Sequence, residues 1–143
     1  MNQLTSYSAA NVAINIDNVL ASGLWEGDDA VVFEPNADIT NFIVGMQGDV
    51  IASITQNRAG LMTLRLQHTS ETHQFLERKY NQMVAGRLPF FKTSLTDTGT
   101  GEGGSADQCL ILRRPNTQYG TNASVREWVI LCANWVNNEV TYE

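Results

Sequence analysis

The sequence predicts a mostly β protein, an antiparallel β-sandwich or barrel with one flanking α-helix at about residues 70–86. Three observations support this fold class: residues 59–68 alternate cleanly, residues 70–86 switch to helical spacing, and the remaining apolar runs are short and separated by turn residues. A single amphipathic helix has one apolar stripe to bury. Because the strands supply the one large partner, we expect this helix to pack on the sheet.

The segment before the helix, Ala59–His68, alternates between apolar and polar side chains. A period of two is typical of a strand with one buried face and one wet face. The apolar side is Met62, Leu64 and Leu66, and the polar side is Thr63, Arg65 and Gln67.

The next segment has its apolar residues at helical spacing. Ser70 is placed to cap the first turn and Gly86 to end the helix. The predicted buried stripe is Phe75, Leu76, Tyr80, Met83 and Val84, and the predicted wet side is Glu77, Arg78, Asn81 and Gln82.

Strands are predicted along most of the remaining chain. The short connections between 40–46, 50–55 and 60–68 predict a three-stranded antiparallel meander. The glycine-rich run at 97–106 is expected to be a flexible loop or hairpin tip. The last predicted strand is apolar on both faces, so we expect it in the middle of a stack or at a subunit contact. The expected strands are Ser8–Asp17, Val19–Trp25, Ala30–Glu34, Thr40–Met46, Val50–Thr55, Gly60–His68, Leu88–Thr96, Asp107–Arg114 and Ser124–Trp135.

Composition favours one domain over residues 1–143 and bears on the partners of the chain. Charged residues make up only 17% of it, so neutral polar groups must cover its surface, and these cost less to desolvate than charges. This favours a subunit of an assembly, with an ordinary soluble domain as the alternative. The net charge of −6 excludes a protein that grips nucleic acid by neutralising phosphates, although an acidic wall can surround DNA without binding it. No run approaches the ~20 apolar residues of a membrane span, and the first 17 residues lack the pattern of a signal peptide.

Two groups of potential metal ligands are set aside. His68 and His73 lie five apart, with no further ligands at spacings that would hold both imidazoles, so a polar surface or helix-cap role is expected. Glu26, Asp28 and Asp29 lack the ligand spacing of a calcium loop and are expected in a solvated loop. The sequence therefore predicts no metal site.

No catalytic or cofactor-binding pattern is found either. The glycines at 99–104 are followed by neither a lysine nor a helix that could hold a phosphate. Neither Cys109 nor Cys132 stands beside a histidine, and buried free thiols are favoured over a disulfide. We expect no catalytic residues, no cofactor and no enzyme, and we assign the aromatic residues Phe90, Phe91 and Trp128 to the core.

One block of the chain resembles the tail tube proteins of contractile-tailed (myovirus-like) bacteriophages. The block Asp49–Ser70 has their polar strand, their glycine before an alternating Thr-Leu-Arg-Leu strand, and their Thr-Ser pair before a helix. The segment Glu127–Ile130 resembles their closing strand, and the likeness extends in order from about Asn11 to Val140. Family members often have proline after the Thr-Ser pair, where this chain has Glu71, a residue that suits a first helical turn.

The resemblance implies a tail-tube-like fold and a structural role in the virion, with assembly in the host bacterial cytoplasm. It implies six copies per ring and rings stacked into a tube inside a contractile sheath, with sheath protein, baseplate and tape-measure protein as partners. DNA would pass through the lumen without specific binding. We expect acidic residues such as Asp49 or Glu102 to face the channel or a ring junction, and a hairpin at Leu20–Val32 or Thr96–Asp107 to contact the next ring.

Three alternatives stay open at this point. The chain could be the tube protein of a phage-tail-like bacteriocin or a secretion-system ring, because the physics of the ring is the same. It could be a monomeric β-barrel that binds a small ligand. A β-sandwich enzyme is disfavoured by the missing acid, base and nucleophile motifs.

Overall fold

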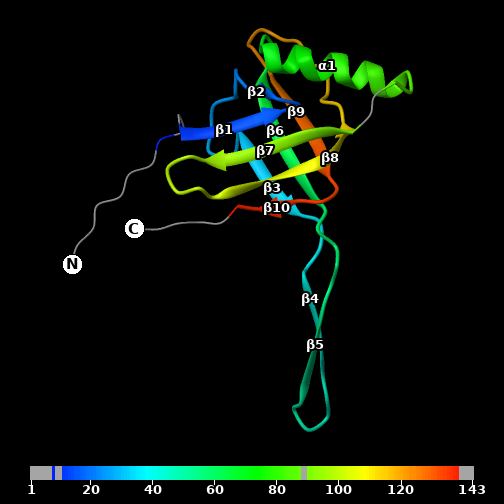
Figure 1. The fold of residues 1–143 in the computed structure, drawn as a ribbon. Helices are drawn as coiled ribbons and strands as arrows, with labels where there is room; N and C mark the ends of the chain where they lie inside the picture. Colours follow the sequence, from blue (N-terminus) through cyan, green and yellow to red (C-terminus); the bar gives the residue numbers. More distant parts are fainter. Residues whose placement is uncertain (1–7, 9–10, 88–89, 139–143) are drawn as a thin grey trace, which may run out of the picture.

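The computed structural model describes residues 8, 11–87 and 90–138, which form a curved antiparallel sheet, one helix and one projecting hairpin (Figure 1). The mostly β fold with a single flanking helix is therefore confirmed. The elements are β1 (Val12–Ile16), β2 (Val19–Leu20), β3 (Val31–Pro35), β4 (Thr40–Val44), β5 (Val50–Ile54), β6 (Gly60–Gln67), α1 (Glu71–Val84), β7 (Phe91–Asp97), β8 (Gly103–Arg113), β9 (Val125–Cys132) and β10 (Val136–Asn137).

The main sheet has the strand order β2-β1-β7-β8-β9-β6-β3, with β10 paired to β8. Every pair is antiparallel, and β9 lies centrally between β8 and β6, as its two apolar faces predicted. Among the described residues, the terminal strands β2 and β3 do not pair with each other, so the sheet does not close into a barrel.

The helix begins where the sequence predicted. The Ser70 side chain accepts hydrogen bonds from the backbone N–H groups of Thr72 and His73, and Gly86 follows the helix with a φ of 74°. Leu76 is fully buried against the sheet, as expected, but Val84 is 72% exposed and does not belong to the buried stripe. Its neighbour Met83 packs against the core, so Val84 lies on the exposed side of the last helical turn.

A lysine replaces one of the expected apolar contacts beneath the helix. Lys79 is buried, and its ammonium group lies 2.6 Å from a carboxylate oxygen of Asp17. The same group lies 5.1 Å and 5.4 Å from the ring centroids of Phe75 and Phe91. Asp17 and Asn18 both have positive φ, as a two-residue hairpin turn between β1 and β2 requires. The ion pair therefore ties the helix to this hairpin.

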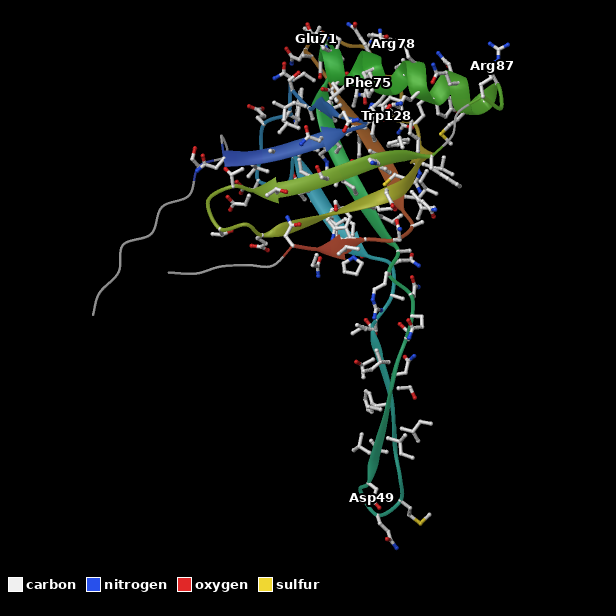
Figure 2. All side chains as sticks on the ribbon, viewed as in Figure 1. Asp49, Glu71, Phe75, Arg78, Arg87 and Trp128 are labelled. Carbon is white, nitrogen blue, oxygen red and sulfur yellow. The ribbon has the colours of Figure 1, made fainter. Side chains whose placement is uncertain are left out.

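The core combines residues from α1 and from the strands β1, β6, β7, β8 and β9. Met62, Leu64 and Leu66 of β6 are fully buried, which confirms the alternating pattern, and Trp128 of β9 is fully buried beneath the helix (Figure 2). Phe91 belongs to the core, but Phe90 is 60% exposed, so its assignment to the core was wrong. The core set is Ile14, Ile16, Met62, Leu64, Leu66, Leu76, Phe91, Ala106, Cys109, Ile111, Trp128, Ile130, Cys132 and Trp135.

The predicted three-stranded meander is wrong. The strands β4 and β5 pair with each other in a separate two-stranded sheet, while β6 pairs with β3 and β9. The β3–β6 ladder ends at Pro35 opposite Gly60, and the β4–β5 ladder begins at Thr40 opposite Ile54. The four elements thus form one long hairpin, which continues out of the body of the protein.

Several predicted boundaries also shift. The first strand begins at Val12, the second is confined to Val19–Leu20, and the last ends at Cys132, with the short strand β10 beyond its predicted end. The glycine-rich run is a hairpin tip, as expected, but its last glycines already belong to β8. Parts of the predicted strands Ser8–Asp17 and Leu88–Thr96 lie outside the described residues.

Candidate assembly surfaces

The hairpin β4–β5, here called the arm, projects from the body of the protein (Figure 1). Every residue of its two strands is exposed, and Asp49 lies near its far end (Figure 2). Its apolar side chains would be buried in an ordinary strand. They are Phe42 at 68% exposed, Ile43 at 71%, Val44 at 56%, Val50 at 60%, Ile51 at 69% and Ile54 at 69%, with Met46 fully exposed at the turn.

The register divides the arm into two faces, because residues opposite each other in an antiparallel pair lie on the same face. One face carries Phe42 opposite Ala52 and Val44 opposite Val50, with Thr40 opposite Ile54 nearer the body. The other face has Ile43 opposite Ile51 in its middle, with the polar pair Asn41 and Ser53 nearer the body. A two-stranded hairpin is marginal in water on its own, and a contiguous exposed apolar surface marks an interaction site.

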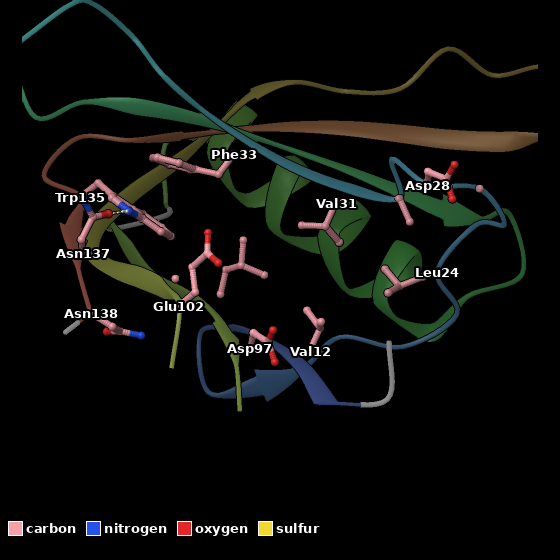
Figure 3. Close-up of a pocket in the computed structure, with 14 residues that line it drawn as sticks. Val12, Leu24, Asp28, Val31, Phe33, Asp97, Glu102, Trp135, Asn137 and Asn138 are labelled. Atoms are coloured by element: carbon pink, nitrogen blue, oxygen red, sulfur yellow. Dashed lines mark hydrogen bonds between the residues drawn. The ribbon is translucent and has the colours of Figure 1, made fainter. Parts of the chain in front are cut away.

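A groove of about 740 Å³ lies between β3 on one side and β1 and β7 on the other (Figure 3). Apolar side chains of β1, β3 and β7 line it, together with Trp135. The Phe33 ring stacks on the Trp135 ring at a centroid distance of 3.9 Å, and the Trp135 indole N–H donates to the side-chain oxygen of Asn137 at 2.9 Å. The groove is open to solvent, unlike the closed pocket that a small-ligand barrel would have.

Gly60 makes the packing of Phe33 possible. A Cβ at position 60 would lie 2.2 Å from the Phe33 ring, so the ring can lie over the glycine only because the side chain is missing. This glycine stands before the Thr-Leu-Arg-Leu strand noted in the sequence, and it helps to shape the wall of the groove.

Acidic side chains lie on both surfaces. Asp28, Asp97 and Glu102 line the groove, and Asp49 lies at the arm (Figures 2 and 3). The cluster expected in a solvated loop is exposed, but Asp29 also forms an ion pair with Arg65 at 3.1 Å.

One of the two histidines, His73, does not have the expected surface or cap role. It belongs to the first turn of α1, its Nδ1 accepts a hydrogen bond of 3.0 Å from the Trp128 indole N–H, and the cap is Ser70. Burial lowers the pKa of His73 below its usual value, although Glu77 opposes the shift. The Nδ1 atom of His68 is buried and has no hydrogen-bond partner among the described residues. Within those residues, no group of three or more His, Cys, Asp or Glu side chains could hold a metal ion.

The two cysteines are free and fully buried, as predicted. Sequence reasoning missed the arm. The available signal was that residues 40–46 and 50–55 are apolar on both faces without the flanking elements that would cover them. None of the helices in the described part of the chain has the length and apolar character needed to cross a membrane.

In the described part of the chain, a projecting apolar arm, an open groove and sheet edges without a further strand are features typical of a structural protein that contacts other chains. The model of the bacteriophage PhiTE tail tube protein family matches residues 4–138, and the chain belongs to this family. It is thus a tube-type structural component of a phage tail and not an enzyme. No curated protein sequence matches.

Solved structures of contractile injection systems share the fold. A sheath/tube terminator of the extracellular contractile injection system PVC, in its extended state, matches with a TM-score of 0.59 at 11% identity, covering 94% of this chain and 97% of that chain. The PVC sheath-tube complex in its extended state gives 0.57 at 10% identity, covering 95% and 93%. The tube-terminating cap of the anti-feeding prophage gives 0.55 at 12% identity, covering 99% and 95%.

Proposed function

We propose that this chain is the ring-forming subunit of the inner tail tube of a contractile phage tail, with six copies per ring and the rings stacked into a tube. The exposed apolar arm is the observation that carries the proposal. Family membership supports the tube role, and the similar structures from tube and sheath assemblies support a position inside a sheath. The number six comes from the resemblance to other tail tubes.

Ring closure would pair or cover the terminal strands of the sheet. Val19 and Leu20 on β2, and Val32 on β3, are apolar and at least 40% exposed. A head-to-tail contact between the two ends of neighbouring sheets would repeat around a ring and leave no free edge.

The arm is the strongest candidate for contact with the next ring, in place of the hairpins at Leu20–Val32 and Thr96–Asp107. The first of these segments is mostly turn and loop in the fold, and the second lines the groove with Asp97, Glu102 and Gly103. Burying a Phe or Ile side chain stabilises a contact by about 1.5–3 kcal/mol. Burial of the six large apolar side chains along the arm would therefore offset part of the cost of joining one ring to the next.

An acidic lumen would let DNA pass without binding. The chain has a net charge of −6, and like charges repel the phosphate backbone. We keep Asp49 and Glu102 as candidates for the channel or a ring junction. Tape-measure protein would occupy the lumen before DNA, baseplate protein would start the tube, and assembly would take place in the host cytoplasm.

The test is assembly of the purified chain, followed by negative-stain electron microscopy and sedimentation. We expect rings or tubes from the wild type and single subunits from the double variant Phe42→Asn/Ile51→Asn. The matched control is Val84→Asn, which removes an equally exposed apolar side chain from the helix and is expected to leave assembly intact. A wild-type chain that stays single at high concentration would refute the proposal.

The tube of a bacteriocin or secretion-system ring remains the second candidate, because the similar structures come from contractile injection systems. Packaged DNA in particles purified from cells that produce this chain would favour the phage tail. Particles with intact tubes but no DNA-filled head would favour the alternative.

A further inference from the structure

Cys109 and Cys132 lie directly opposite each other on the neighbouring strands β8 and β9. Opposite residues of an antiparallel pair share a face of the sheet, and both side chains are fully buried. Both thiols are free. The assembly role described above uses neither of them.

A hydrogen bond next to this pair indicates its type. The backbone N–H of Ala133 donates to the carbonyl of Gln108 at 3.0 Å, which places Gln108 and Ala133 at a hydrogen-bonded position of the ladder. Pair types alternate along an antiparallel ladder, which makes Cys109 and Cys132 a non-hydrogen-bonded pair. The Cα atoms of such a pair are about 4.5 Å apart. Disulfides span Cα separations of about 4.4–6.8 Å, so this pair lies at the short end of the permitted range.

We propose that Cys109 and Cys132 form a reversible cross-strand disulfide when the chain meets a low-molecular-weight disulfide. The bond would join two core strands of one subunit without rearranging the sheet. Its short span predicts some strain and hence a bond that thiols reduce readily. This inference is independent of the proposed tube function, because the bond lies within one chain.

The exchange is balanced in two steps. A thiolate of the pair attacks one sulfur of oxidised glutathione, which forms a mixed disulfide and releases one glutathione thiolate. The second cysteine then attacks the protein sulfur of the mixed disulfide and releases the other glutathione. Two protein thiols are oxidised, one glutathione disulfide is reduced to two thiols, and the two protons pass to the released thiolates.

The surroundings of the pair favour Cys109 as the first nucleophile. A hydrogen bond from the Cys132 thiol lowers the pKa of Cys109 to about 7, and the same interaction raises the pKa of Cys132. The Thr93 hydroxyl is buried, has no other hydrogen-bond partner among the described residues, and also lowers the pKa of Cys109. Because both thiols are buried, the exchange requires a transient opening between β8 and neighbouring strands, and it will be slow in the folded chain.

The test compares the disulfide equilibrium in the folded and the unfolded chain. The full chain is incubated in glutathione redox buffers, from the reduced and from the oxidised side, with and without strong denaturant. Trypsin separates the two cysteines into the peptides Thr93–Arg113 and Glu127–Glu143, so mass spectrometry can count the linked product. If the fold holds the two cysteines close together, the equilibrium constant for forming the disulfide should be about tenfold higher in the folded chain than in the unfolded chain. We expect a smaller gain than disulfides usually give, because the short span strains the bond.

Single-cysteine controls assign the product. Cys109→Ala and Cys132→Ala can form only a mixed disulfide with glutathione, and they should yield no linked peptides. A folded-state constant equal to or below the unfolded-state constant would overturn the proposal. A product that links separate chains on a non-reducing gel would also overturn it. The wild-type measurement decides the matter even if a variant fails to fold.

Discussion

The body of the protein and its arm are built from equally apolar strands, yet they bury their side chains in different places. In the body, Leu64 and Trp128 are fully buried between sheet and helix. In the arm, Ile43 and Ile51 are about 70% exposed although they face each other across a regular ladder. Apolar strands therefore do not by themselves indicate a core within the same chain. The difference also predicts which substitutions damage folding and which damage assembly.

The largest expected effect on folding comes from the body. Trp128→Ala would remove a fully buried side chain and the hydrogen bond that its indole donates to His73. We expect a loss of about 3–5 kcal/mol in the free energy of unfolding, measured by urea denaturation. Trp128→Phe keeps most of the packing and should lose clearly less. Equal losses in the two variants would show that the cavity is not the dominant cost.

A smaller effect is expected where the body meets the arm. Gly60→Ala would place a Cβ 2.2 Å from the Phe33 ring, which stacks on the Trp135 ring. Overpacking of this kind costs about 1–3 kcal/mol in the free energy of unfolding. In a Phe33→Leu background the ring is absent, and the same substitution should cost less. A double-mutant cycle by urea denaturation measures this coupling, and additive losses would contradict the contact.

The helix–sheet junction should make stability depend on pH. Burial lowers the pKa of His73 below its usual value of 6.5, so below that pH the unfolded chain binds more protons than the folded chain. The free energy of unfolding should then fall as the pH drops below 6.5, by at most about 1.4 kcal/mol per pH unit for one proton. The contribution of this group should be constant above pH 6.5.

Thermal unfolding of variants between pH 7.5 and pH 5 would measure this effect. His73→Gln keeps an acceptor for the Trp128 indole and should flatten the acid side of the profile. The charged and titratable groups that act on the pKa of His73 are Glu77, Arg126, Arg114 and His68. His68→Gln is the matched control, and it should keep the fall of stability with decreasing pH. An unchanged profile in His73→Gln would mean that other carboxylates control the acid transition.

The sequence predicted local structure well wherever one face is buried within the chain. The period of two in 59–68 and the capping residue Ser70 lead directly to β6 and α1. Strand pairing was harder to predict. The short connection Gln56–Arg58 indicates a hairpin between its flanking strands, but the chain there passes straight from β5 into β6 because each pairs with an earlier strand.

The periodicity of the sequence could not predict the buried polar contacts or the exposure of the arm either. Lys79 looks like a solvent residue in the sequence, and only the fold shows that Asp17 and two aromatic rings surround it. The arm has the apolar composition of a core strand. No local sequence pattern indicates whether its apolar side chains are buried by the same chain or by another chain. The block that carries the family resemblance, in contrast, has a packing role in the fold, because Gly60 makes room for the Phe33 ring and Met62, Leu64 and Leu66 are fully buried.

The smallest effect on folding should come from substitutions in the arm, and this result is the clearest test of the difference between the arm and the body. In Phe42→Asn/Ile51→Asn, no side chain leaves the core, because both residues are exposed in the single chain. Exposed substitutions usually change the free energy of unfolding by less than about 0.5 kcal/mol each. Urea denaturation of the dissociated double variant should therefore match that of the wild type under conditions in which both are single subunits, while assembly is lost. A loss of several kcal/mol would mean that the arm folds back onto its own body in solution, and the separation between the two regions would then be wrong.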